Sequence, residues 1–214
     1  MSGYRREFDR TLEALEAQVI ELFAIVAEGL PAAAHALVTG GSETVQMLAE
    51  RERVVNALYL AAEDLAGRQI LLQAPVAADL RFLLSVVRIA PELERSHDLV
   101  TEIAARAGRV GRQDLTPAVC GLAGQMGDLA CGMWRKTADA WYDRERSALP
   151  ALTKQQEHMT ELHASLTAEL ATGRMATPVT IEMTLIGRCY ERLGAHAVNI
   201  ARRVTYLAGR AGSC

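Results

Sequence analysis

The chain has 214 residues, of which half are apolar and only 5% aromatic, with 23 basic and 26 acidic side chains and a net charge of −3. This length is enough for one or two small domains with a buried core. The acidic balance argues against a general nucleic-acid-binding protein, which would show a basic stripe, and no nucleic-acid partner is expected. Charged residues precede the first apolar run, so we expect no signal peptide and a cytoplasmic protein whose scattered cysteines are reduced thiols.

Apolar side chains recur at the three-and-four spacing of an amphipathic helix, beginning with Leu12, Leu15, Val19 and Leu22. Prolines at 75, 117, 150 and 178 mark the joints between such segments, because the first turn of a helix tolerates proline. Thr116 and Thr177 are predicted helix caps. No segment alternates as a strand does. The pattern predicts six long helices, over residues 4–38, 43–71, 76–107, 117–146, 151–172 and 178–208.

The third and sixth predicted helices repeat one another. The segment PELERSHDLVTEIAARA (91–107) returns 97 positions later as RCYERLGAHAVNIARRV (188–204), and residues 52–58 match 156–162 at an offset of 104. Such self-similarity indicates a duplicated unit. We therefore predict an all-α tandem repeat of two three-helix bundles, covering residues 1–108 and 117–209 and joined by the short polar segment 108–116.

Carboxylates that share a helix face are the first candidate site. Glu94 and Asp98 are four residues apart, and Glu52 and Asn56 form a weaker pair with the same spacing on the second helix. Carboxylate oxygens directed at one point favour binding of a hard metal ion, although Arg95 could supply the neutralising positive charge instead. The alternative is that these residues form an ordinary solvent-exposed helix face. Arginines at 106, 109, 112, 202, 203 and 210 are interpreted as cations that suit helix C-termini.

Catalysis is the weaker interpretation. Glu94 and His97 form a Glu-x-x-His unit, which di-iron bundles use twice, but the unit occurs only once in this chain. No nucleophile motif or glycine-rich phosphate loop is present in the sequence. We therefore expect no enzyme, with a metal-dependent bundle enzyme or metal-storage protein as the alternative.

The segment QAPVAADLRFLLSVVRIAPELERSHDLVTEIA (73–104) resembles the signature of the PhoU family, and YERLGAHAVNIARRV (190–204) is similar to the same signature in a second copy. The resemblance covers nearly the whole chain. It implies two three-helix bundles and a negative regulator of the phosphate-starvation response. Such a regulator would be an adaptor between the ATPase of the Pst phosphate transporter and a PhoR-type sensor histidine kinase, and it would often be a homodimer.

Some members of this family bind metals through paired carboxylates, which would correspond here to Glu52, Asn56, Glu94 and Asp98 in the first bundle only. The second copy has Ala195, Gln156 and Thr160 at three of the four matching positions. We therefore expect a single divalent or trivalent ion in the first bundle, or none, and no multinuclear cluster in the second.

Three further residues are predicted to dock a partner protein. Arg95, Glu191 and Arg192 belong to the repeated Glu-Arg motif, and an arginine fork beside a carboxylate suits specific recognition. A structural role for the same residues is the alternative.

Overall fold

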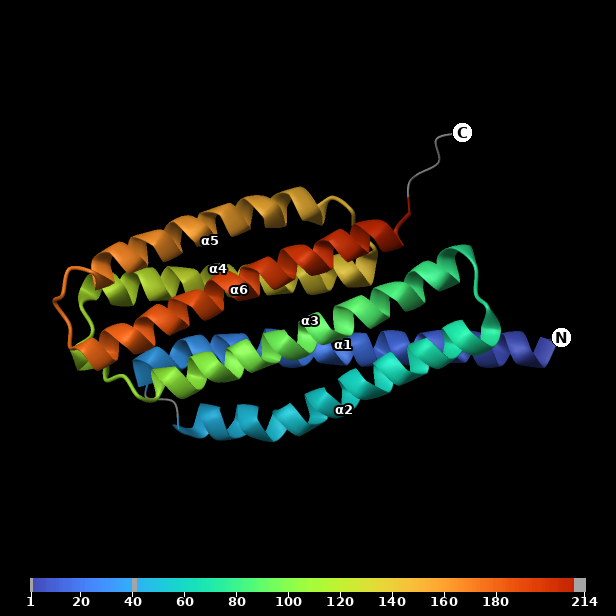
Figure 1. Cartoon of the computed structure of the whole chain (residues 1–214), viewed down its shortest axis with the longest axis horizontal. Helices are drawn as coiled ribbons and strands as arrows, with labels where there is room; N and C mark the ends of the chain where they lie inside the picture. Colours follow the sequence, from blue (N-terminus) through green and yellow to red (C-terminus); the bar gives the residue numbers. More distant parts are fainter. Residues whose placement is uncertain (1, 40–41, 210–214) are drawn as a thin grey trace.

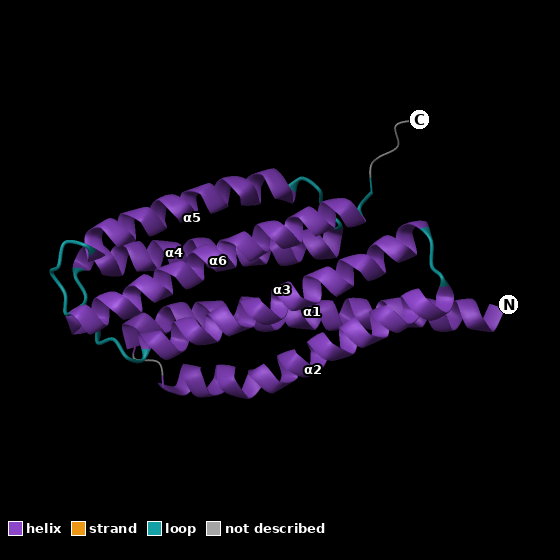
Figure 2. Ribbon diagram, viewed as in Figure 1, coloured by secondary structure: helices purple, strands orange, loops and turns teal. Residues whose placement is uncertain are grey.

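The computed structural model describes residues 2–39 and 42–209, and within them it contains six α-helices, one short 3-10 turn and no strand. The helices are α1 (Ser2–Thr39), α2 (Ser42–Gln73), α3 (Ala77–Ala107), α4 (Pro117–Asp143), α5 (Ala148–Leu170) and α6 (Thr177–Leu207), and the 3-10 turn η1 (Arg112–Asp114) lies between α3 and α4. The predicted all-α fold is confirmed. Figure 2 shows that the connections are short and lie at the ends of the long helices.

The helices pack as two neighbouring sets of three (Figure 1). In the first set α3 packs against both α1 and α2, and in the second set α6 packs against both α4 and α5. The two sets meet along α3 and α6, which run side by side in opposite directions, and also along α1 and α4. The two helices that carry the repeated sequence therefore form a large part of the contact between the bundles.

Aromatic side chains continue the core from one bundle into the other. Trp134 and Trp141 of α4 are fully buried, and the ring of Phe23 from α1 lies 6.4 Å and 6.3 Å from theirs. Phe82 of α3 adds a further contact with Trp141, at 6.1 Å between centroids. These separations are typical of favourable aromatic pairs. Since few aromatic residues are present, their concentration here indicates that the two bundles share one continuous core.

The start of α4 follows the sequence prediction and its end does not. Thr116 caps the helix, because its Oγ1 accepts a hydrogen bond of 3.2 Å from the backbone N–H of Val119, and Pro117 occupies the first helical position. The helix ends at Asp143, earlier than predicted, because Arg144 adopts a left-handed conformation with φ of 56°. A left-handed residue ends a helix in the same way as the glycine usually found there.

Other helix boundaries also differ from prediction by a few residues. Thr177 does not cap α6: it is the first helical residue, and Ala176 precedes it without a side-chain hydrogen bond. Helix α5 begins at Ala148, earlier than predicted, because its first turn includes Pro150. Helix α3 begins at Ala77, so Pro75 lies in the preceding loop. These shifts of a few residues leave the order of the helices unchanged.

Residues Arg5–Leu37 of α1 form a stretch that is long and apolar enough to cross a membrane, judged by length and composition alone. Its side chains at the helical spacing, including Leu15, Val19, Leu22 and Val26, are completely buried against other helices. The core helix of a soluble bundle has the same composition, and the packing of α1 explains its apolar character.

Candidate functional site

A buried polar contact lies in the middle of the seam where α3 meets α6. The Oγ of Ser96 lies 2.9 Å from Nδ1 of His196, and Oε2 of Glu92 lies 3.6 Å from the same nitrogen. Burial lowers the pKa of His196, and Arg192 and Arg95 lower it further, while Glu92 opposes the change. The neutral imidazole is therefore favoured, and the seam combines apolar packing with a specific polar pair.

The predicted partner-binding residues Arg95 and Arg192 come from different bundles, and both lie close enough to His196 to lower its pKa. Both are exposed, and both act on the charge of the same buried His196. The antiparallel packing of α3 and α6 thus brings the two copies of the repeated arginine, both exposed, near the same buried histidine. We call the surface of Arg95 and Arg192 the seam face.

Glu191, the third predicted partner-binding residue, contacts α5 of its own bundle. Its carboxylate Oε2 is 3.4 Å from Nδ1 of His163 on α5, and its backbone carbonyl accepts a 3.2 Å hydrogen bond from Nε2 of Gln156. The side chain is about two-thirds buried. The structure therefore places Glu191 against a helix of its own bundle, while Arg192 next to it faces outward.

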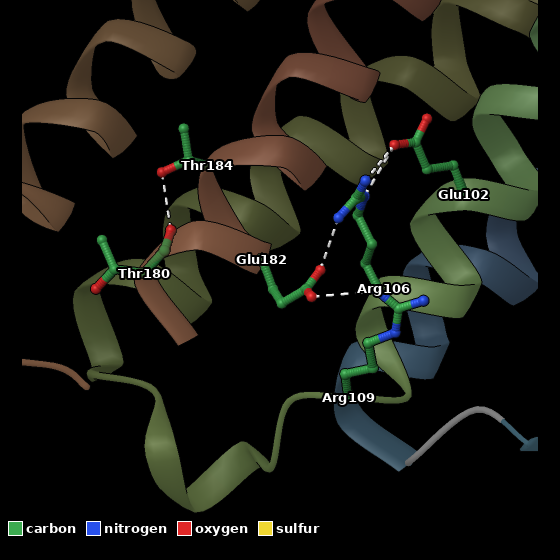
Figure 3. Close-up of polar contacts among 6 residues, drawn as sticks. All are labelled: Glu102, Arg106, Arg109, Thr180, Glu182 and Thr184. Carbon is green, nitrogen blue, oxygen red and sulfur yellow. Dashed lines mark hydrogen bonds and ion pairs between the residues drawn. The ribbon is translucent and has the colours of Figure 1, made fainter. Parts of the chain in front are cut away.

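An ion-pair cluster ties the bundles together near the C-terminal end of α3 (Figure 3). Arg106 Nη1 lies 2.8 Å from Oε2 of Glu182 on α6, and Arg106 Nε donates a 2.9 Å hydrogen bond to Glu102. Arg109 reaches the other oxygen of Glu182 at 3.3 Å. The hydrogen bond from Arg106 is the main reason that the pKa of Glu182 is lowered.

The sequence assigned Arg106 and Arg109 to a helix C-terminus and missed their role across the seam. The spacing of Glu102 and Arg106 predicts a pair within one helix, and that pair is present. Glu182 could not be connected with them from the sequence, because the register of α3 against α6 is a property of the packed molecule.

The predicted metal-binding carboxylates lie on a surface shared by α2 and α3. Burial raises the pKa of Glu94, and the charge of Asp98 raises it further. Burial also raises the pKa of Asp98, followed by the charge of Glu52. None of these three carboxylates forms an ion pair in the described residues. Asn56 is exposed on the same helix as Glu52.

These side chains influence one another without converging on a point. Among residues 2–39 and 42–209, no group of three or more His, Cys, Asp or Glu side chains is arranged to hold a metal ion. Charges interact over several ångströms, whereas hard cations need oxygens at about 2.0–2.6 Å. A metal ion in the first bundle therefore stays a prediction. Binding would require the carboxylates of Glu52, Glu94 and Asp98 to move closer to one another.

Two buried groups near the predicted sites have properties that suit a structural role. His97 is fully buried, and this burial lowers its pKa. Burial raises the pKa of the Cys189 thiol to about 12, so the thiol stays protonated near neutral pH. A protonated thiol is a poor nucleophile.

Comparison with known proteins places these features in a family. The model described as "PhoU domain" matches residues 19–107 and again 123–204. A protein of Zymomonas mobilis named "Phosphate-specific transport system accessory protein PhoU homolog" is 29% identical over 95% of this chain and 87% of its own length. A protein of Synechocystis with the same name is 28% identical over 95% of this chain and 92% of its own length.

Solved structures agree with the fold. PhoU from Pseudomonas aeruginosa superimposes with a TM-score of 0.86 at 23% identity, covering 94% of this chain and 98% of that one. The phosphate transport system regulatory protein PhoU from Streptococcus pneumoniae gives a TM-score of 0.84 at 24% identity, with 94% and 97% covered. Because the family model matches both halves, and so most of the sequence, this chain belongs to the PhoU family.

Proposed function

We propose that this chain is an accessory protein of a phosphate-specific transport system that represses the phosphate-starvation response in the cytoplasm. The family match over both halves carries the proposal, together with relatives named as phosphate-specific transport accessory proteins. In this role the chain performs no chemistry. It links the ATPase of a phosphate transporter to a PhoR-type sensor histidine kinase, and acts by shifting the populations of their states.

The seam face supplies a surface for such an adaptor. Arg95 and Arg192 are exposed, carry no ion-pair partner among the described residues and come from different bundles. A partner that contacts both would bind α3 and α6 at once, and its binding would depend on the packing of the two bundles. Guanidinium groups suit recognition of carboxylates on such a partner.

The binding test compares the wild-type chain with the double variant Arg95→Ala/Arg192→Ala, using immobilised transporter ATPase and the cytoplasmic part of the kinase. The matched control is Arg10→Ala/Arg53→Ala, which removes two exposed arginines from α1 and α2. We expect at least tenfold weaker binding by the seam-face variant to one of the partners, with unchanged thermal stability. Equal binding by both variants, or a large loss of stability in the seam-face variant, would refute the proposed role of this surface.

A metal-binding function is the second candidate. The raised pKa values of Glu94 and Asp98 favour it: burial raises both, the charge of Glu52 raises both further, and a cation would relieve this repulsion. We propose that an ion, if bound, would be held by Glu52, Glu94 and Asp98, with Asn56 as a further oxygen ligand. Elemental analysis of the purified chain, with an Asp98→Asn variant beside it, tests this proposal directly.

A further inference from the structure

Five arginines line two neighbouring hollows where the C-terminal end of α6 lies beside the N-terminal part of α3. The first hollow, of about 430 Å³, is lined by Arg88, Arg202 and Arg203. The second, of about 560 Å³, is lined by Arg81, Arg146 and Arg202. Because Arg202 belongs to both, the two hollows adjoin. We call them together the arginine-lined hollows.

The donors of these arginines are largely unused. None of the five forms an ion pair with a carboxylate in residues 2–39 and 42–209. Arg202 donates to Oδ1 of Asn199 at 3.0 Å, and Arg146 donates to the backbone carbonyl of Ala208. The Nε of Arg81 is buried without any hydrogen-bond partner. A guanidinium carries five N–H donors, so most of this capacity remains available.

Two of the guanidinium groups converge on one point although they come from different elements. A Cβ atom placed on Gly209 would lie 3.6 Å from Nη2 of Arg81 and 3.9 Å from Nη2 of Arg146. Gly209 has a φ of +74°, a conformation that glycine adopts readily, and it leaves that space free of a side chain. Like charges held this close repel one another unless an anion lies between them.

The arginine-lined hollows keep an excess of positive charge. Glu92 is the one carboxylate in the lining of the first hollow, where three arginines face it, and its Oε2 lies 3.6 Å from Nδ1 of His196 in the seam. The whole chain is net acidic, with a charge of −3, so unpaired positive charge is not a general property of its surface. Elsewhere the chain pairs its half-buried arginines, as Arg106 with Glu182 and Arg144 with Glu16.

We propose that the arginine-lined hollows bind a small anion that contains two or more linked phosphoryl groups. The planar fork of arginine matches two phosphate oxygens at once. Arg81 and Arg88 are seven residues apart on α3, which is roughly 10 Å along a helix. A single phosphate cannot contact both Arg81 and Arg88 across this distance, whereas linked phosphoryl groups can. Thr205 and Tyr206 add hydroxyl groups beside the second hollow. The inference is independent of the proposed role in phosphate transport.

The test is calorimetric titration of the full chain with inorganic tripolyphosphate, orthophosphate and sulfate at matched ionic strength. The variant Arg88→Ala/Arg202→Ala removes two exposed groups of the hollows, and Arg10→Ala/Arg53→Ala is again the control with equal charge change. We expect tripolyphosphate to bind wild type at least tenfold more tightly than orthophosphate does. The hollow variant should bind it at least tenfold more weakly than wild type, and the control within about twofold. Added salt should weaken binding, because exposed charges are screened.

Several results would overturn the inference: absence of tripolyphosphate binding, equal loss in the control, or equal affinity for orthophosphate. Binding of an octa-aspartate peptide or of phosphatidylglycerol vesicles through the same arginines, without tripolyphosphate binding, would assign the site to a protein or a membrane instead. If the double variant fails to fold, Arg202→Lys replaces it, since this change keeps the charge and removes the fork. The Lys variant should then bind tripolyphosphate measurably more weakly than wild type, and unchanged binding would contradict the proposal.

Discussion

Ser96 and His196 form a polar contact inside an otherwise apolar seam, and its contribution to the free energy of unfolding can be measured. Ser96→Ala should lower the free energy of unfolding by about 1 kcal/mol, because it removes a buried hydrogen bond and leaves Nδ1 of His196 without this partner. Ser165→Ala is the matched control. The hydroxyl of Ser165 donates a hydrogen bond to the backbone carbonyl four residues earlier, as the hydroxyl of Ser96 also does, but Ser165 is exposed. Urea denaturation should show the control within about 0.5 kcal/mol of wild type. Equal effects of the two changes would contradict a contribution from the seam contact.

His97 should make stability depend on pH. Burial lowers its pKa in the folded state, so the unfolded chain takes up the proton more readily. The free energy of unfolding should therefore fall as pH is lowered from about 7.5 to about 5.5, through the ordinary pKa of histidine near 6.5. Glu94 and Asp98, whose pKa values are raised, oppose this loss as they protonate.

The variant His97→Met isolates the contribution of that one residue. It removes the titrating ring while keeping an apolar side chain in the core, so the fall in stability with decreasing pH should be smaller than in wild type. His158→Gln changes an exposed histidine and should leave the dependence as it is. A His97→Met variant with the wild-type pH dependence would show that the buried ring is not its source.

At the scale of elements, the Arg106–Glu182 pair should couple α3 to α6. Both side chains are about four-fifths buried, and their atoms are 2.8 Å apart. A double-mutant cycle with Arg106→Met and Glu182→Gln should give a coupling energy of about 1 kcal/mol or more. The exposed pair Arg68–Asp64, within α2, should give less than about 0.5 kcal/mol. Similar coupling in both cycles would mean that the cluster does not hold the bundles together.

Removing one negative charge from the surface carboxylates of α2 and α3 (Glu52, Glu94 and Asp98) should stabilise the folded protein. Asp98→Asn should raise the midpoint of thermal unfolding of metal-free protein near pH 7, because burial and the charge of Glu52 disfavour the ionised carboxylate there. Asp128→Asn, an exposed change in the second bundle, should have little effect. If Mn²⁺ or Fe³⁺ instead stabilises wild type and Asp98→Asn abolishes this effect, the metal-binding prediction is supported.

The helices were the most predictable part of this chain, since apolar spacing and proline positions depend only on local sequence. The end of α4 was missed because Arg144, which no rule marks as a helix stop, takes the left-handed conformation. It stacks over Trp141 and reaches Glu16 of α1, so tertiary contacts determine that end. Local propensity is weak beside such packing.

At the scale of the whole molecule, the duplication predicted two related helices but not how they meet. The antiparallel contact of α3 and α6 places Arg95 and Arg192 near His196, Arg106 beside Glu182, and the basic end of α6 beside Arg81 and Arg88. Each of these groupings joins residues of α3 and α6 that are between 76 and 122 positions apart. The sequence contains the side chains, but only the packed bundles determine the register that combines them.

The most direct test of the regulatory role is to delete the gene and follow a phosphate-starvation reporter, such as secreted alkaline phosphatase, in phosphate-rich medium. We predict that the reporter stays high without the gene, that the intact gene restores repression, and that Arg95→Ala/Arg192→Ala restores it poorly while Arg10→Ala/Arg53→Ala restores it fully. A reporter that remains repressed after deletion would contradict the proposed regulatory role.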